Sequence, residues 1–442
     1  GLGDVYKRQD ADRVIVAMGS VCDTIQETVD FLNARGEKVG MVKVHLYRPF
    51  SAKHLLAVLP ETVKHISVLD RTKEPGSLGE PLFLDVVAAL KGSAFNDVPV
   101  YGGRFGLGSK DTVPAHIIAV YNNMAAPQPK PEFTLSIEDD VTHLSLPVTE
   151  NPDTTPAGTT SCKFWGLGSD GTVGANKDSI KIIGDNTDMF AQGYFFYDSK
   201  KSGGITVSHL RFGSSPITST YLINKANFVA CHCPSYVTKY DMVQDLVPGG
   251  TFLLNCIWTP DQLDSQLPAS MKRYIAENNI HFYIINGIKI AEEVGLPGRA
   301  STILQSAFFA ISGILPVEKA IELMKAAVVK KFSKKGEAVV NANFAGIDRG
   351  AQEIVKVDVP DSWKTAEDAP RRLEVPTDRP EMKKFVKEIL DPVGRLHGDD
   401  LPVSAFADRA DGVYPAGSAA FEKRGIAITV PQWDGTKCAQ CN

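Results

Sequence analysis

A glycine-rich stretch at residues 164–177 contains residue types that are well suited to holding an anion. Glycine has no Cβ, so the backbone can turn tightly and come close to a ligand. Where such a loop opens into a helix, its backbone N–H groups can bind a phosphate. The spacing Gly166-x-Gly168-x-x-Gly171 matches the dinucleotide fingerprint, although a tight turn without a ligand gives the same pattern. The candidate anion-binding residues of this loop are Gly166, Gly168, Ser169, Asp170, Gly171, Thr172 and Lys177.

Two basic segments further along the chain could complete the same site. Lys200 and Lys201 follow a strand-like stretch, at the place where a nucleotide-binding fold reads the ribose end of its ligand. Paired lysines suit an extra phosphate, whereas the nearby Asp198 would suit NAD. Arg211 ends the next strand-like stretch and could pair with a phosphate or a carboxylate. A solvated turn and a surface ion pair remain open as alternatives.

Cysteines offer a second kind of chemistry. Cys438 and Cys441 form a C-x-x-C pair, which suits zinc, an iron–sulfur cluster or a redox dithiol. A cluster needs about four cysteines, so either the pair is inert or the motif continues beyond Asn442. The run Cys231-His232-Cys233 looks similar, but successive side chains of a strand point to opposite faces. We therefore expect Cys231 to behave as a buried apolar residue.

The sequence supplies no complete catalytic constellation. The nine histidines are dispersed, and we find no nucleophile elbow, H-E-x-x-H motif or P-loop. We therefore assign no catalytic residue within this chain.

Bulk properties are those of a soluble, multidomain protein. The 442 residues are 43% hydrophobic and 22% charged, with a net charge of −5, which predicts about two to four domains and argues against nucleic acid as the main partner. No apolar run is long enough to span a bilayer, and the segment 1–9 lacks the apolar core of a secretory signal. The scattered cysteines suit a reducing cytoplasm.

Strand-like and helix-like stretches alternate over residues 10–124, which predicts βαβ units and a parallel sheet. The predicted strands are Arg13–Met18, Lys38–His45 and His65–Asp70. The predicted helices are Asp23–Ala34, Ser51–Leu59, Pro81–Leu90 and Pro114–Asn122. Residues 125–160 are rich in proline and are predicted to be a linker with one short strand at Phe133–Ile137.

A second α/β domain is predicted over residues 161–355. Its predicted strands are Ser179–Ile183, Gly193–Tyr197, Ile205–Leu210, Phe228–Cys231, Gly250–Asn255 and His281–Asn286. Its predicted helices are Pro268–Asn278, Ser301–Ile311 and Pro316–Val329. Residues 356–430 are more irregular. The predicted fold class is therefore α/β, with two Rossmann-like parallel-sheet domains in series followed by a small irregular α+β domain.

Several of these segments together resemble the central part of pyruvate:ferredoxin (flavodoxin) oxidoreductases. Residues 44–51, 69–76 and 101–110 resemble the transketolase-C-terminal-like domain, which would occupy residues 10–124. Residues 164–177, 197–204, 207–216 and 343–348 resemble the gamma domain, at 161–355. Residues 421–427 resemble the signature of the small domain that is named for Glu-Lys-Arg, and this domain would lie within residues 356–430. Residues 431–442 resemble the opening of the ferredoxin-like domain. Residues 1–9 do not fit the family.

The resemblance implies an enzyme that oxidatively decarboxylates pyruvate. Thiamine diphosphate, 4Fe–4S clusters and coenzyme A take part in the complete enzyme, which passes electrons to ferredoxin or flavodoxin and is usually a dimer. The thiamine site belongs to domains outside this chain, so this chain alone is expected to be inactive. Cys438 and Cys441 would be two ligands of an incomplete 4Fe–4S site.

The resemblance also gives the glycine loop a ligand, coenzyme A. Coenzyme A carries a pyrophosphate and a ribose 3′-phosphate. The loop amides would hold one of these two groups, and Lys200, Lys201 or Arg211 would hold the other. Two alternatives remain: a nicotinamide-dependent Rossmann dehydrogenase built on the second domain, and a non-enzymatic interaction module whose glycines only shape turns.

Overall fold

The structure is a computed structural model that describes residues 5–6, 10–198, 203–368, 373–422 and 432–438. Its contacts divide the chain into two compact units. Unit 1 comprises Gly1–Thr159, Ser215–Leu222 and Thr377–Ala416, and unit 2 comprises Thr160–Ser214, Ile223–Pro376 and Gly417–Asn442. Within the described ranges, every helix is too short or too polar to span a lipid bilayer.

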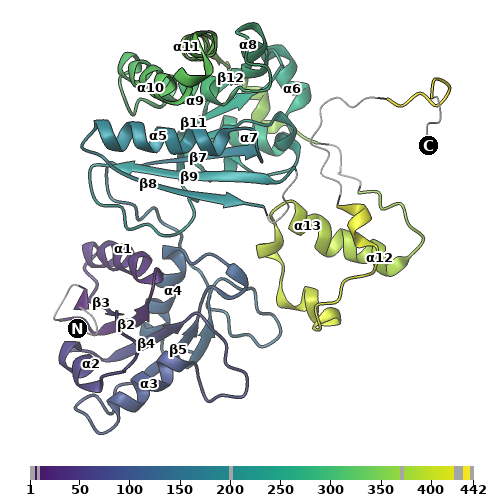
Figure 1. The fold of residues 1–442 in the computed structure, drawn as a ribbon. Helices are drawn as coiled ribbons and strands as arrows, with labels where there is room; N and C mark the ends of the chain where they lie inside the picture. The colour runs from purple at the N-terminus through teal and green to yellow at the C-terminus, as the bar shows by residue number, and fades with distance from the viewer. Residues whose placement is uncertain (1–4, 7–9, 199–202, 369–372, 423–431, 439–442) are drawn as a thin grey trace. The chain divides into compact units, whose positions relative to one another are not determined.

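Unit 1 contains a six-stranded sheet in the order β1-β3-β2-β4-β5-β6 (Figure 1). All neighbours are parallel except β1, which pairs antiparallel with β3. The strands are β1 (Val5–Tyr6), β2 (Arg13–Met18), β3 (Val39–Val44), β4 (His65–Asp70), β5 (Val100–Arg104) and β6 (Glu132–Thr134). The helices of this region are α1 (Val21–Ala34), α2 (Ala52–Val58), α3 (Pro81–Leu90) and α4 (Pro114–Ala125). The predicted βαβ alternation is confirmed.

Alternation along β2 explains why helices cover both faces of this sheet. Ile15 and Ala17 pack in one apolar cluster with α1 and α4. Val14 and Val16 pack in a second cluster with α2 and α3. Successive strand residues point to opposite faces, so an uninterrupted apolar strand needs a cover on each side.

The predicted linker and the predicted third domain are partly absorbed into unit 1. The linker supplies β6, which extends the sheet beside β5. Residues 377–416 form α12 (Pro380–Phe385), α13 (Asp391–Gly394) and shorter helical turns. They are held to the linker by the amide of Ser404, which donates to Asp140 Oδ1 at 2.9 Å. In the described part of 356–430 the elements after Lys356 are helical, and residues 369–372 and 423–430, which complete the predicted α+β region, lie outside the described residues.

A buried histidine makes unit 1 sensitive to acid. His116 Nδ1 accepts a hydrogen bond from the amide of Val113 at 3.1 Å, and burial lowers the pKa of His116 from 6.5 to about 4. The folded state therefore binds this proton less readily than the unfolded state, so the stability contributed by neutral His116 is present above pH 6.5 and is lost as the pH falls towards 4.

We expect unit 1 to lose up to about 3 kcal/mol over this window, because each pKa unit is worth about 1.4 kcal/mol. Hydrogen exchange of α4 amides between pH 7 and pH 4, corrected for intrinsic rates, measures the loss. The variant His116→Asn keeps an acceptor but does not titrate, so its dependence on pH should be shallower. Identical pH profiles of the variant and the parent would contradict the assignment.

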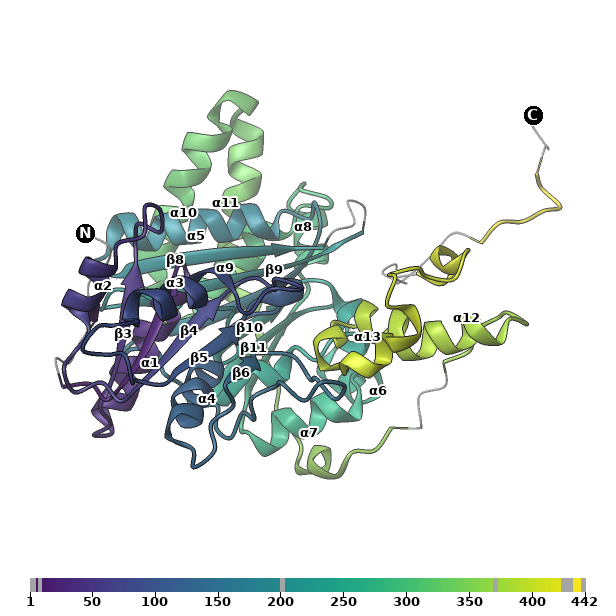
Figure 2. The same cartoon turned by 90° about the horizontal axis from the view of Figure 1, so that it is seen from below.

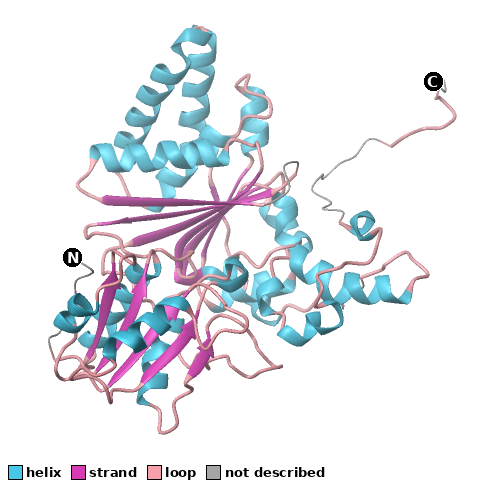
Figure 3. Ribbon diagram, turned by 60° about the horizontal axis from the view of Figure 1, so that its bottom comes forward, coloured by secondary structure: helices cyan, strands magenta, loops and turns pink. Residues whose placement is uncertain are grey.

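Unit 2 contains a seven-stranded sheet in the order β13-β12-β11-β10-β7-β9-β8. Its strands β8, β9, β10 and β11 are labelled in Figure 2. Its strands are β7 (Thr160–Leu167), β8 (Phe190–Tyr197), β9 (Ile205–Gly213), β10 (Ala226–Cys231), β11 (Leu246–Asn255), β12 (His281–Ile285) and β13 (Val355–Lys356). Its helices are α5 (Thr172–Asn186), α6 (Leu263–Gln266), α7 (Ala269–Glu277), α8 (Gly287–Glu293), α9 (Ser301–Ser312), α10 (Val317–Phe332) and α11 (Glu337–Gln352). Helices pack on both faces of the sheet (Figure 3).

The second sheet is mixed, whereas the sequence predicted a parallel one. β7, β10, β11 and β12 are parallel, but β9 runs antiparallel to both β7 and β8, and β13 runs antiparallel to β12. The connection from β8 to β9 is too short for a crossover, and a short connection between paired strands forces them to be antiparallel.

The predicted strand Ser179–Ile183 lies inside α5, so that prediction is wrong. Its β-branched residues favoured a strand, but the buried positions Ala175, Ser179, Ile182 and Ile183 recur at helical spacing. The strand that precedes the glycine loop is β7, which the sequence analysis did not delimit. Together, β7, the loop and α5 form the strand–turn–helix unit that the glycine fingerprint requires.

Candidate functional site

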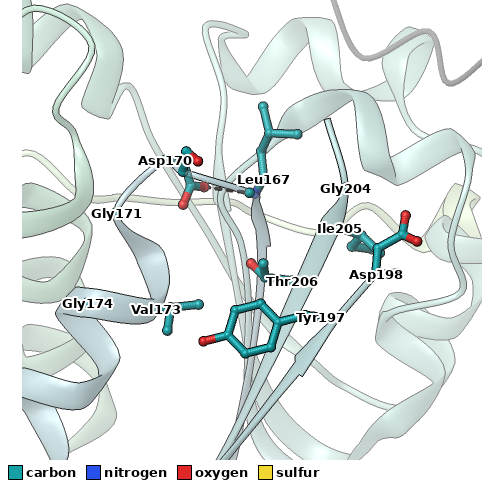
Figure 4. Close-up of a pocket in the computed structure, with 12 residues that line it drawn as sticks. Leu167, Asp170, Gly171, Val173, Gly174, Tyr197, Asp198, Gly204, Ile205 and Thr206 are labelled. Atoms are coloured by element: carbon teal, nitrogen blue, oxygen red, sulfur yellow. Dashed lines mark hydrogen bonds between the residues drawn. The ribbon is translucent and has the colours of Figure 1, made fainter. Parts of the chain in front are cut away.

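A cavity of about 480 Å³ opens where β7 ends and α5 begins (Figure 4). Its wall comes from the glycine loop, the first turn of α5, the end of β8 and the start of β9. The lining residues are Leu167, Gly168, Ser169, Asp170, Gly171, Val173, Gly174, Tyr197, Asp198, Gly204, Ile205 and Thr206. The structure therefore brings most of the predicted glycine loop into one concave site.

Part of the loop is held by its own hydrogen bonds. The amides of Leu167 and Thr172 donate to the two carboxylate oxygens of Asp170, at 2.9 and 2.8 Å. The amide of Gly168 donates to the carbonyl of Gly204 at 2.8 Å, which fixes the loop against the β8–β9 connection. Asp170, predicted as a ligand contact, thus shapes the loop, and its negative charge disfavours an anion beside its carboxylate.

Other amides of the loop remain open. Among the described residues, the amides of Ser169, Gly171, Val173 and Gly174 make no hydrogen bond. Three of these belong to the start of α5, a 15-residue helix whose N-terminus carries partial positive charge. Gly171 has a φ of +91°, and Ser169 also lies in the left-handed region at +74°. The loop can therefore offer amides to an anion at the mouth of the cavity.

A contact between the side chains of Thr172 and His232 holds the loop in place. The Thr172 hydroxyl and His232 Nδ1 lie 2.7 Å apart, and the carbonyl of His232 accepts from Asn255 Nδ2 at 2.9 Å. Burial lowers the pKa of His232, which keeps its imidazole neutral. Thr172, predicted as a ligand contact, has its hydroxyl engaged here and does not line the cavity. Its close approach to Gly166 also explains that glycine, since a Cβ there would lie 2.6 Å from Thr172 Oγ1.

The predicted basic residues differ in their position relative to the cavity. Lys200 and Lys201 lie outside the described residues, but Asp198 and Gly204, on either side of them in sequence, line the cavity. Lys177 is exposed on α5, with its Nζ 5.2 Å from the centre of the Phe195 ring. Neither Lys177 nor Gly166 is part of the cavity wall.

Arg211 does not belong to this cavity, so its predicted role is wrong. Leu167 pairs with Ile205 at the cavity end of the β7–β9 ladder, whereas Ser161 pairs with Arg211. Six residues of strand separate the two pairs, which is roughly 20 Å. Arg211 is 2% exposed and its guanidinium donates to Gln192 Oε1 at 3.0 Å.

Thr206 is a site residue that the sequence analysis missed. It lines the cavity from β9 and is 5% exposed. Its hydroxyl is buried and has no hydrogen-bond partner among the described residues. A buried hydroxyl without a partner is costly, so a polar ligand atom would satisfy it. Only the antiparallel register of β9, which puts Thr206 opposite Gly166, could have revealed it.

A second helix N-terminus approaches the loop. A Cβ on Gly171 would lie 2.7 Å from Ser301 Oγ, at the first residue of α9. Gly171, Gly174 and Ser301 also border a neighbouring cavity of about 650 Å³ between α5, α9 and α10. Gly171 and Gly174 therefore border two cavities.

Charged residues in two of the segments of unit 1 that resemble the family, 69–76 and 101–110, make structural contacts. Asp70 ends β4 and accepts hydrogen bonds from the amides of Leu82 and Phe83, at 3.0 and 3.1 Å, while burial raises its pKa. Arg104 Nε lies 2.7 Å from Glu80 Oε1 in a largely buried ion pair. These contacts fix the start of α3 against the sheet.

The described cysteines lie in different environments. Cys231 is fully buried, and burial raises its pKa well above the usual value. His232 and Cys233 have separate partners, the Thr172 hydroxyl and the Ser235 hydroxyl. Cys438 is exposed, and Cys441 lies outside the described residues. Within the part of the chain that the structure describes, no three His, Cys, Asp or Glu side chains are placed to hold a metal ion.

Known families match most of this chain. Residues 161–353 match the family profile described as pyruvate ferredoxin/flavodoxin oxidoreductase, and residues 11–117 match pyruvate:ferredoxin oxidoreductase core domain II. Residues 369–427 match EKR, a domain of unknown function. The first two matches contain, respectively, the glycine loop and the βαβ units of unit 1.

Relatives of known function align along the whole chain. It is 54% identical to a pyruvate-flavodoxin oxidoreductase of Enterobacter agglomerans and to a pyruvate:ferredoxin oxidoreductase of Moorella thermoacetica, over 100% of this chain and 37% of each relative. It is 52% identical to a pyruvate-flavodoxin oxidoreductase of Klebsiella pneumoniae, over 98% of this chain and 36% of the relative. The chain thus spans little more than a third of the length of these relatives. With the family resemblance confirmed, we conclude that the chain belongs to the pyruvate ferredoxin/flavodoxin oxidoreductase family.

Proposed function

We propose that this chain is the coenzyme A-binding portion of an enzyme that oxidatively decarboxylates pyruvate. In that reaction coenzyme A takes the acetyl group, carbon dioxide leaves, and ferredoxin or flavodoxin accepts the electrons. The observation that carries the proposal is the cavity at the glycine loop, where the open amides of Gly171, Val173 and Gly174 meet the buried Thr206 hydroxyl. The chain contributes binding and orientation of the ligand, and we propose no catalytic residue in it.

Coenzyme A fits this site by its chemistry. It carries a pyrophosphate, which suits the α5 N-terminus, and a ribose 3′-phosphate, which suits a pair of lysines. We assign the pyrophosphate to the open amides and the 3′-phosphate to Lys200 and Lys201, whose sequence neighbours Asp198 and Gly204 line the cavity. The exposed ring of Tyr197, in the same wall, offers a surface on which adenine can stack.

The cofactors of the reaction belong outside the described residues. A 4Fe–4S cluster needs about four thiolates, and Cys438 is the one described cysteine near the motif, so these residues do not fit a cluster by themselves. We assign the remaining cluster ligands and thiamine diphosphate to the part of the longer protein that the relatives carry. We also place the complete enzyme in the cytoplasm, as a homodimer, which the free cysteines and the family resemblance support.

Calorimetric titration of the 442-residue chain with coenzyme A, dephospho-coenzyme A and NAD tests the proposal. Coenzyme A should bind and NAD should not. Asp198 in the cavity wall favours the alternative of a nicotinamide site, and binding of NAD without coenzyme A would support that alternative. Binding of neither ligand would favour a non-enzymatic module.

The double variant Lys200→Ala/Lys201→Ala tests the phosphate assignment. We expect roughly tenfold or more weaker binding of coenzyme A, because a charge-assisted hydrogen bond is worth about 1.5–3 kcal/mol. Affinity for dephospho-coenzyme A, which lacks the 3′-phosphate, should change little. Lys383→Ala/Lys384→Ala removes the same charge from exposed positions on α12 and serves as the control. Equal loss for both ligands would contradict the lysine assignment.

A further inference from the structure

The neighbouring cavity of about 650 Å³ is a groove along α5, which we call the α5 groove. Its walls come from α5, the start of α9 and the second half of α10. The groove begins at Gly171 and Gly174, which also line the cavity at the glycine loop, and it reaches Asn186 at the end of α5. The two cavities therefore share the residues that carry two of the open amides.

A largely buried carbonyl oxygen in the α5 groove has no partner. Gln305 of α9 lines the groove and is 8% exposed. Its Nε2 donates to the carbonyl of Ala175 at 3.1 Å and to Ser179 Oγ at 2.9 Å, which fixes the side chain. Its Oε1 makes no hydrogen bond with any described residue. An unpaired oxygen at this depth is costly, so it is suited to accept from an N–H or O–H group of a ligand.

Apolar side chains form the floor of the α5 groove. Ile182 of α5 and Met324 and Val328 of α10 line it and are 6%, 2% and 5% exposed. A concave, mainly apolar surface with a few fixed polar groups is typical of a small-molecule site. The α5 groove therefore suits a ligand that alternates apolar groups with hydrogen-bond donors.

We propose that the α5 groove holds the pantetheine arm of coenzyme A, and that Gln305 Oε1 accepts from an amide or hydroxyl group of the arm. This inference rests on the proposed function, which assigns the pyrophosphate to the open amides of α5. The pyrophosphate joins the adenosine half of coenzyme A to the pantetheine arm, so the two halves leave it in different directions. The cavity at the glycine loop receives the adenosine half, and the α5 groove starts from the same glycines, Gly171 and Gly174.

The length of the arm fits the groove. About twelve bonds separate the pyrophosphate from the thiol, which is roughly 14 Å at the extension of a peptide chain. α5 rises about 18 Å between Gly174 and Asn186. The thiol would therefore lie within about one helical turn of Asn186.

Calorimetric titration of the 442-residue chain with two ligands tests the proposal. Coenzyme A is compared with adenosine 3′-phosphate 5′-diphosphate, which lacks the pantetheine arm, and the parent should bind coenzyme A at least roughly tenfold more tightly. Ala327→Phe adds a ring to the groove from α10. It should abolish this difference and leave the affinity for the armless nucleotide unchanged.

Two further variants sharpen the test. Val329→Phe adds the same ring to α10 at a position outside the groove wall, 45% exposed, and should bind both ligands like the parent. Gln305→Met keeps the length of the side chain but loses the acceptor, so it should weaken binding of coenzyme A alone, by roughly three- to tenfold.

The outcomes separate this inference from the proposed function. If the parent binds coenzyme A and Ala327→Phe binds it equally well, the arm does not lie in the groove, although the loop site stands. An equal loss for both ligands in Ala327→Phe would also overturn the arm assignment, because the variant would then act on the loop. A parent that binds neither ligand would overturn the proposed function and this inference with it.

Disulfide exchange tests the position of the thiol. In a Cys438→Ser/Cys441→Ser background, the thiolate introduced by Asn186→Cys should attack coenzyme A disulfide, form a mixed disulfide and release one coenzyme A thiolate. Val329→Cys, outside the groove wall, should react at least roughly tenfold more slowly, because no bound ligand lies beside it. Mass spectrometry measures both rates. Equal or absent labelling of the two variants would overturn the placement of the arm.

Discussion

Gly171→Ala should weaken coenzyme A binding roughly 10- to 100-fold while the chain remains folded. Gly171 has a φ of +91°, which an alanine adopts only with strain, and the added Cβ would lie 2.7 Å from Ser301 Oγ and 3.0 Å from Ser301 Cβ. The loop must shift, and the open amides of Gly171, Val173 and Gly174 shift with it. We expect a stability loss of about 1–2 kcal/mol, which is smaller than the effect on the site.

Gly184→Ala is the matched control for this variant. Gly184 also lies in α5, but its Cβ would make an ordinary contact at 3.8 Å from Ala191 Cβ. Alanine there should leave coenzyme A affinity unchanged and raise stability slightly, because it favours the helix. Calorimetric titration gives the affinity and thermal unfolding the stability. If Gly171→Ala bound coenzyme A with unchanged affinity, the loop would not be part of the binding site.

Glu27→Ala should destabilise unit 1 by about 2–4 kcal/mol. Glu27 lies in α1 and is 3% exposed. Its Oε1 accepts from the Thr154 hydroxyl at 2.6 Å and the Tyr221 hydroxyl at 2.5 Å, and its Oε2 accepts from the Ser219 hydroxyl. Alanine leaves three buried hydroxyls without this acceptor and opens a cavity.

The Glu27 carboxylate holds two parts of the chain that are distant in sequence, residue 154 and residues 219–221, against α1. Hydrogen exchange of peptides from α1 and from 215–222 measures the loss, with peptides of unit 2 as an internal reference. Glu27→Gln keeps the size and one acceptor oxygen, so it should lose less stability than Glu27→Ala. Glu61→Ala removes an exposed carboxylate of unit 1 and should change stability by no more than about 0.5 kcal/mol. Equal exchange in Glu27→Ala and Glu61→Ala would contradict the role of Glu27.

Elements with a strong local signal are predictable from the sequence. β2, β4 and α3 begin and end at the predicted residues, because each is a short apolar run bounded by glycine, proline or charge. Ser179–Ile183 was misassigned because isoleucines satisfy both a strand and a buried helix face. The direction of β9 depends on the β8–β9 connection, which propensity along the strand does not encode.

The site was predictable only in its local part. The glycine loop and its position after a strand follow from spacing, but the division of its amides into bonded and open ones depends on Asp170 and Gly204. Thr172 is engaged by His232, which is 60 residues away in sequence. Arg211 looked equivalent to Lys200 and Lys201 in sequence, yet strand register places it at the far end of β9. Such contacts are set by tertiary structure.

The central claim is that the open amides at the start of α5 bind the phosphates of coenzyme A. Nitrogen-15 glycine labelling of the 442-residue chain, followed by titration with coenzyme A, tests it most directly by amide chemical shift. We predict that the amides of Gly171 and Gly174 shift strongly and saturate with the calorimetric affinity, whereas that of Gly184 stays in place. Saturating coenzyme A that leaves Gly171 and Gly174 unmoved would contradict the account.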